Sequence, residues 1–165
     1  MKKYIHIYNM ALPIWLLIFF PRMWLFVAPV NFIIDSLVLV IGMYLYKLEN
    51  KKGIYKKVII KVFLFGFLSD FIGALPLTLI TLHNLSNDAL SEVISAVMLN
   101  PFRNAWAFIW VSCAICLSMW CIYFFNSRVS FKKLDIAEKE RKKLSLFIAI
   151  FTAPYFFYLP TAWFF

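Results

Sequence analysis

Charged residues are scarce in this chain of 165 residues, where they make up 15% of the sequence. A typical soluble domain carries about 25%. Hydrophobic residues make up 64%, and the mean hydropathy is +0.81. A small soluble fold leaves much of its surface in water and could not hide this many apolar side chains. The composition therefore excludes an ordinary water-soluble domain and predicts a lipid bilayer as the main partner of the chain.

Cysteine is also scarce, and its placement excludes a disulfide framework. The three cysteines, Cys113, Cys116 and Cys121, all lie in one apolar segment. The C-x-x-C spacing of the first two is similar to that of quinone-linked disulfide-forming enzymes. Such enzymes need a second cysteine pair in an outer loop, and this chain has none. We therefore interpret these residues as small hydrophobes on a packed helix face.

Enzyme motifs are absent. The sequence contains no H-E-x-x-H, G-x-S-x-G or P-loop pattern, and its two histidines, His6 and His83, are far apart. We expect no catalytic residue, no cofactor and no metal site, and we rank a membrane redox or lipid-modifying enzyme last. The net charge is +9 without an aromatic-basic motif, so we expect no nucleic-acid partner.

Long apolar runs are abundant instead. A hydrocarbon layer about 30 Å thick needs about 20 apolar residues of helix. Five runs approach or exceed that length, namely 4–20, 24–46, 62–82, 105–125 and 144–165. They predict one all-α integral membrane domain over 1–165, a polytopic transmembrane helical bundle with five spans. The first run is short, so the alternative is four spans plus a re-entrant or interfacial N-terminal segment.

The basic residues predict the orientation of these spans, because short loops rich in Lys and Arg stay in the cytoplasm. Two basic clusters flank the third and fourth runs, while the segment 83–104 between those runs has only one basic residue. Five crossings then place the N-terminus in the cytoplasm and the C-terminus outside. The heavy use of Lys, Ile, Asn and Phe suggests a bacterial cytoplasmic membrane. The clusters are Lys47, Lys51, Lys52, Lys56, Lys57 and Lys61, and Arg128, Lys132, Lys133, Lys139, Arg141, Lys142 and Lys143.

The two longer connections have helical patterns of their own. In the outer one, Asn87 or Asp88 is a suitable cap for a short amphipathic helix that Pro101 ends. One face of that helix carries Leu90, Val93, Ile94 and Val97. In the inner one, acids and bases alternate over 132–143, which predicts a solvated helix continuing into the last span.

Two aspartates lie deep in apolar runs. Asp35 is eleven residues from the inner end of its run, or about 17 Å, and Asp70 is eight residues from its own, or about 12 Å. A charged side chain at the centre of a membrane helix costs at least about 2.5–3.5 kcal/mol. These acids therefore need an explanation.

Helical neighbours predict where the acids face. Asn31, Asp35, Val38 and Gly42 form one stripe, and Gly66, Asp70 and Gly73 form another, with Ser69 beside it. Small residues let membrane helices approach closely, and polar residues bond across the contact. We therefore expect both stripes inside the bundle. The functional hypothesis is an ion or substrate site of Asp35, Asp70, Asn31 and Ser69, taking a proton or a cation. The alternative is that each aspartate only joins two helices.

Arg22 and Arg103 are expected at the outer boundary. They would contact an anion or lipid phosphates there, or serve simply as anchors at a helix end. The sequence therefore favours a small transport or channel component, acting as a homo-oligomer or as a subunit of a larger membrane complex. A non-transporting membrane protein that binds a partner, such as an assembly factor, an immunity protein or a sensor, is the alternative.

Overall fold

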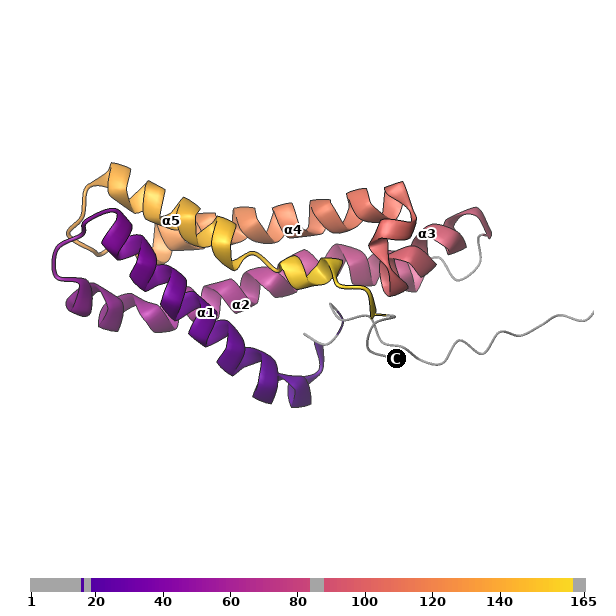
Figure 1. Ribbon diagram of the computed structural model, residues 1–165, viewed down its shortest axis with the longest axis horizontal. Coiled ribbons are helices and arrows are strands. Elements are labelled where there is room, and N and C mark those ends of the chain that lie inside the picture. Colours follow the sequence, from indigo (N-terminus) through magenta and orange to yellow (C-terminus); the bar gives the residue numbers. More distant parts are fainter. Residues whose placement is uncertain (1–15, 17–18, 84–87, 162–165) are drawn as a thin grey trace, which may run out of the picture.

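The computed structural model describes residues 16, 19–83 and 88–161, without the side chains of 82, 83, 88 and 89. These residues form helices joined by short connections, and no strand occurs among them (Figure 1). The predicted all-α class is therefore confirmed.

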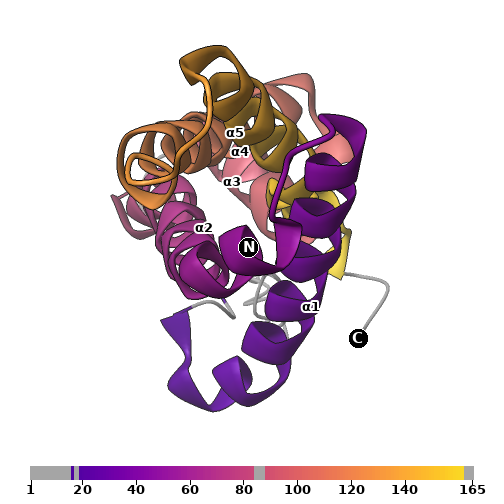
Figure 2. The same ribbon diagram turned by 90° about the vertical axis from the view of Figure 1, so that its left-hand side faces the viewer.

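Four long helices form the body of the molecule. α2 packs on α4, α4 on α5, α5 on α1 and α1 on α2, so the helices close a ring (Figure 2). A shorter helix, α3, packs against α4 at one end. The bounds are α1 Trp24–Leu45, α2 Lys51–His83, α3 Asp88–Leu99, α4 Ala105–Phe125 and α5 Glu138–Thr152. Short 3₁₀ turns are η2 Pro21–Met23, η3 Pro101–Arg103 and η5 Tyr155–Tyr158, and η4 Asn126–Ser130 is a π-helical turn.

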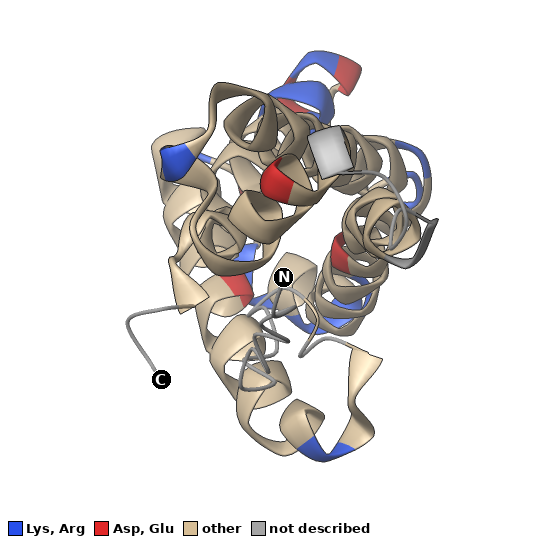
Figure 3. Cartoon of the chain, turned by 90° about the vertical axis from the view of Figure 1, so that its right-hand side faces the viewer, with Lys and Arg blue, Asp and Glu red and all other residues tan. Residues whose placement is uncertain are grey.

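Within the described residues, three helical stretches are long and apolar enough to cross a membrane. They are Pro21–Leu45, Lys51–Thr81 and Ala105–Ser130. They contain or overlap the predicted runs 24–46, 62–82 and 105–125. Figure 3 shows that most of the length of these helices carries neither acidic nor basic residues.

α2 begins eleven residues before the predicted run. Asn50 has φ 46°, which turns the chain, and its side-chain oxygen accepts a hydrogen bond from the Gly53 amide at 3.2 Å. The helix starts at once after this turn. Lys51 to Lys61 of the first basic cluster therefore lie on a helix of 33 residues, about 50 Å long, and not in a loop.

The first and last predicted runs, 4–20 and 144–165, do not appear as continuous helices among the described residues. The run 4–20 lies outside the described residues apart from residues 16, 19 and 20. A continuous helix over the last run is wrong, because α5 ends at Thr152. Pro154 has no amide hydrogen and forces the residue before it out of helical geometry. Beyond the break the chain still follows α4: the hydroxyl groups of Ser112 and Tyr158 lie 2.8 Å apart.

Both basic connections lie at the same end of the bundle. Residues 46–50 join α1 to α2, residues 131–137 follow η4, and both turns stand at the end opposite α3 (Figure 1). The predicted orientation places both basic connections on one side of the membrane, and it therefore requires them to lie at the same end of the bundle. The predicted outer helix is present as α3, and its Ile94 and Val97 are buried. The charged helix over 132–143 starts only at Glu138.

The core consists of two apolar clusters with a polar layer between them. One cluster centres on Leu39, Val58, Ile122 and Ile148, and the other on Leu77, Val111, Ala114 and Phe157. α2 and α4 each contribute residues to both clusters, one cluster at each end of the helix. The buried polar side chains between the two clusters are Ser69, Asp70 and Ser118, and Asp35 is buried on α1.

Candidate ion site

Both predicted stripes face the interior of the bundle. Asp35 is 5% exposed and Asp70 is 4% exposed. Gly42, Gly66 and Gly73 are buried. The two carboxylates are therefore turned away from the outer surface of the bundle, as the spacing of the small residues predicts.

Asp35 and Asp70 line one cavity of about 250 Å³. A cavity needs only about 10–15 Å³ to hold a water molecule, so this one has room for several. α1, α2 and the end of α5 with the segment that follows it each form one wall. The lining residues are Asn31, Ile34 and Asp35 from α1, Gly66, Phe67 and Asp70 from α2, and Phe151, Thr152, Ala153, Pro154, Tyr155 and Phe156. We call this space the acidic cavity.

Asp70 is held from the α4 side. The Ser118 hydroxyl donates a hydrogen bond to its Oδ1 at 2.9 Å. Gly73 makes this approach possible, since a Cβ there would lie 2.9 Å from the Ala114 carbonyl oxygen and 2.9 Å from the Ser118 Cβ. One oxygen of Asp70 is thus held by a hydroxyl donor that carries no charge of its own.

Asp35 has no hydrogen-bond donor among the described residues. Gly66 leaves space for its carboxylate, because a Cβ at that position would lie 3.3 Å from Asp35 Oδ2. Its carboxylate lines the same cavity as that of Asp70. No Lys or Arg occurs among the described residues that line the cavity. The described part of the site therefore combines two acids with no basic side chain to balance them.

The broken end of α5 completes the cavity. Since Pro154 has no amide hydrogen, the Ile150 carbonyl loses its helical donor, and the Tyr155 hydroxyl donates to it instead at 2.7 Å. The carbonyl groups of Phe151 and Thr152 receive no hydrogen bond from the described residues. The C-terminal end of a helix carries partial negative charge on such groups. All three walls thus present oxygen atoms or negative potential.

The structure brings three of the four predicted site residues together and leaves out the fourth. Asp35, Asp70 and Asn31 line the cavity, but Ser69 does not. Ser69 is fully buried, and its hydroxyl donates to the Phe65 carbonyl one turn earlier at 2.6 Å. Consecutive helical residues point about 100° apart, so Ser69 cannot share the direction of Asp70.

Sequence reasoning missed Ser118 and the carbonyl groups at residues 151 and 152. Pro154 gave a signal for the break, since proline commonly ends or kinks a helix. Ser118 gave almost none, because a single serine in an apolar helix is common and its partner is set by how α4 packs on α2.

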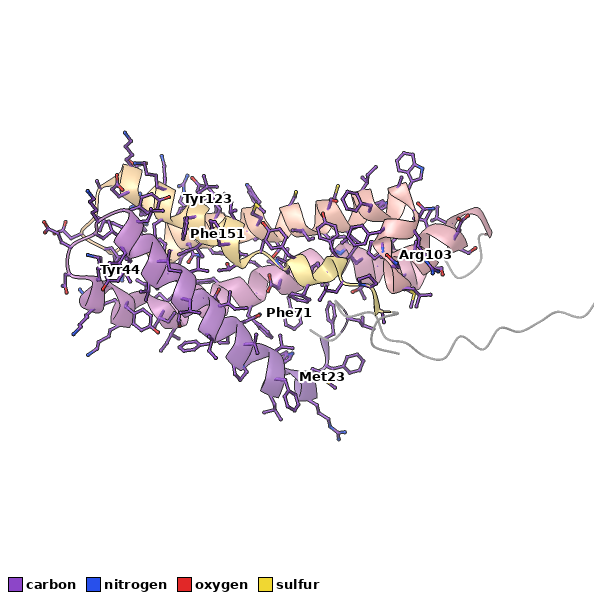
Figure 4. All side chains as sticks on the ribbon, in the orientation of Figure 1. Met23, Tyr44, Phe71, Arg103, Tyr123 and Phe151 are labelled. Atoms are coloured by element: carbon purple, nitrogen blue, oxygen red, sulfur yellow. The ribbon has the colours of Figure 1, made fainter. Side chains whose placement is uncertain are left out.

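The two arginines predicted at the outer boundary lie away from the acidic cavity. Arg22 is exposed in η2, and Arg103 is exposed in η3 at the end where α3 packs (Figure 4). Neither lines the acidic cavity. The interpretation of the cysteines was partly wrong. Cys113 and Cys116 are exposed on α4, and only Cys121 is buried.

Metal-ligand clusters and known relatives add nothing to this site. No group of three or more His, Cys, Asp or Glu side chains that could hold a metal ion occurs in the part of the chain that the structure describes. The chain matches no protein-family model, no curated protein and no solved structure. Its function must be argued from the acidic cavity itself.

Proposed function

We propose that this chain is a multi-pass membrane protein that binds a proton or a cation between Asp35 and Asp70, as a transport or channel component. One observation carries the proposal. Two buried carboxylates from different helices line the same cavity, and none of the described residues that line it with them is basic.

Charge balance supports a positively charged ligand. Two carboxylates close together in a low-dielectric interior do not both ionise easily, because each destabilises the charge of the other. Protonation or a bound cation would remove that repulsion. Ser118 is neutral, so it orients Asp70 without replacing the ligand.

The helix break supports the same conclusion. At membrane depth, non-helical backbone is tolerated only where it is buried in protein or lines a water-filled cavity. In transporters with discontinuous helices, unwound carbonyl groups and the C-terminal ends of half-helices coordinate cations. The carbonyl groups of Phe151 and Thr152 stand at such an end, beside the two acids.

The finer membrane arrangement belongs to this proposal. We place five crossings in a bacterial cytoplasmic membrane, with the basic ends of α1, α2, α4 and α5 in the cytoplasm. The fifth crossing would be the broken path of α5 and η5 along α4. A bundle this small has little room for a private pathway, so association into a homo-oligomer or a larger complex is part of the proposal.

The test compares Asp→Asn variants, which keep the shape and the hydrogen bonding of the side chain but not its titrating proton. Asp35→Asn, Asp70→Asn and the double variant would be purified and assayed in liposomes for proton and sodium or potassium flux. Asp135→Asn is the matched control, because Asp135 is exposed in the connection before α5. Thermal unfolding would be recorded for every variant.

We expect each single variant to lose flux by about tenfold or more, which corresponds to at least about 1.4 kcal/mol. The unfolding temperatures of the variants should stay close to that of the parent protein. The double variant should lose no more flux than the single variant with the lower flux, because residues of one site are not additive. Full flux in a stable Asp35→Asn protein would disprove the site. If the parent protein shows no flux, the alternative of a non-transporting membrane protein that binds a partner would be favoured.

A further inference from the structure

A second cavity, of about 510 Å³, lies where α4 passes through the π-helical turn η4 towards α5. Four of the residues that line it are basic: Arg128, Lys132, Arg141 and Lys142. Glu138 is the one acid among the described residues that line it. We call this space the basic pocket.

The acid does not balance the bases, because it is already paired. Lys142 Nζ lies 2.7 Å from Glu138 Oε1. This hydrogen bond, with the positive charges of Lys142, Arg141 and Arg128, holds the pKa of Glu138 below its usual value. Arg128, Lys132 and Arg141 form no salt bridge within the described residues. About three positive charges therefore remain for a ligand.

Arg141 is the least exposed of these bases. Its Nε is shielded from solvent and has no hydrogen-bond partner among the described residues. A buried N–H group without an acceptor costs about 1–3 kcal/mol, and more when it is charged. A guanidinium group presents a planar fork of donors that fits phosphate oxygens. The pocket thus contains a donor suited to an oxyanion.

The pocket is continuous with an apolar surface. Phe124 lines it, and the ring of Phe124 stacks on that of Trp120 one turn earlier on α4, with centroids 5.6 Å apart. Trp120 is 61% exposed and Phe124 is 42% exposed. Tryptophan is enriched where a membrane meets water. A ligand with an anionic head and an apolar tail would fit both surfaces at once.

The π-helical turn shapes the pocket. Asn126–Ser130 widens the backbone at the end of α4, and such turns occur frequently at functional sites. The turn supplies Ser127 and Arg128 to the lining, while α5 supplies Glu138, Arg141 and Lys142 across from it.

We propose that the basic pocket binds a phosphate group, and that its natural source is the headgroup of an anionic phospholipid whose acyl chain lies along Phe124 and Trp120. Basic pockets between helices on the cytoplasmic side are known to take such headgroups. This site is separate from the acidic cavity, so it does not depend on the proposed transport function.

The test measures thermal unfolding and lipid affinity of the full chain in detergent, with phosphatidylglycerol, phosphatidylcholine or inorganic phosphate added. The pocket variant is Arg128→Gln with Arg141→Gln. The matched control is Lys133→Gln with Lys139→Gln, which removes the same charge from exposed positions that do not line the pocket. Arg128→Gln alone is the second variant, because Arg128 is exposed and its loss should not disturb folding.

We expect phosphatidylglycerol to raise the unfolding temperature of the parent and control proteins, and phosphatidylcholine to have no effect. The pocket variant should bind phosphatidylglycerol roughly tenfold or more weakly. An equal gain with inorganic phosphate would keep the phosphate site but assign it to a free anion. Equal weakening in the control variant would show a diffuse surface charge effect and overturn the proposal, as would the absence of any gain in the parent protein.

Discussion

The acidic cavity and the basic pocket both lie where a helix departs from regular α geometry, yet they carry opposite charge. The acidic cavity stands beside the break of α5 at Pro154, between the two apolar clusters of the core. The basic pocket stands beside the π-helical turn at the end of α4. The acidic cavity holds two deeply buried acids, whereas most of the bases of the basic pocket are exposed.

The length of the side chains explains why the signs are distributed in this way. Lys and Arg have long apolar stems, which let the charge reach water while the stem covers apolar surface. An aspartate carboxylate stands one carbon from the backbone and cannot move away from its depth. Exposed bases at a helix end, such as Arg128 and Lys132, therefore cost little without a ligand, whereas the shielded Nε of Arg141 costs more. Under the proposed function, a proton or a cation balances the acids inside the bundle, so Asp35 and Asp70 are the residues on which that proposal rests.

Removing the charge at each site should have unequal effects on stability. Replacing Asp35 with Leu should stabilise the fold by on the order of 1–3 kcal/mol, because the carboxylate is buried and no described residue donates a hydrogen bond to it. Arg128→Leu, at an exposed position, should change stability by no more than about 0.5 kcal/mol. Thermal unfolding in detergent would measure both. A clear loss of stability in Asp35→Leu would show that the carboxylate joins helices, and the contrast between the two sites would fail.

Closing the break in α5 should weaken the acidic cavity and leave the basic pocket unchanged. In Pro154→Ala, the restored amide can bond the Ile150 carbonyl and extend the helix, which removes oxygen atoms from the wall. We expect cation affinity to fall by about 1 kcal/mol, or roughly fivefold. The control is Pro76→Ala, since α2 continues through Pro76. Equal affinity in Pro154→Ala and the parent protein would exclude the carbonyl groups as ligands.

The two serines at the polar layer should differ by a smaller amount. Ser118→Ala removes the donor to Asp70 and should change cation affinity by about 0.6 kcal/mol, less than threefold. Ser69→Ala removes a bond within α2 only and should leave affinity unchanged. Isothermal titration of both variants would show this. A larger effect at Ser69 would restore the assignment made from sequence.

The smallest expected effect is at the mouth of the basic pocket. Lys142→Gln should raise the pKa of Glu138 towards its usual value, because the hydrogen bond and nearest positive charge are lost. Since the pKa is lowered in the folded protein, this pair stabilises the fold at neutral pH, and its contribution disappears as the pH falls through that pKa. Carbon NMR of the Glu138 carboxyl group would follow the titration. An unmoved pKa would mean that Arg141 and Arg128 dominate the field.

Sequence predicted the helices best where local chemistry sets their limits. α4 runs over the predicted 105–125, and its start is fixed by the Asn104 side chain, which accepts from the amides of Trp106 and Ala107. α2 was predicted to start too late because its lysines were assigned to a loop. Lysine is a good helix former, and only the turn at Asn50 sets the true start.

The candidate site could be predicted only in part, since it depends on contacts between helices. The stripes of Asp35 and Asp70 follow from the helical period, so their burial was predictable. The partner of Asp70 depends on how far α4 slides along α2, which local sequence does not encode. Pro154 marks a break, but the bond that replaces the lost one, from Tyr155 to Ile150, depends on the path of the chain beyond it.

The buried residues of α1 lie only in its second half. No residue from Trp24 to Ile34 is buried, and the side chains of Leu25 and Phe26 are 76% and 73% exposed. The first buried residue along the helix is Asp35. Helices adjust their tilt to the thickness of the surrounding bilayer at modest cost, and packing is what opposes this. In the first half of α1, ring contacts from Trp24 to Phe67 and Phe71 supply packing of this kind. We expect the tilt of this half, and with it the width of the acidic cavity beside Asp35, to change with bilayer thickness.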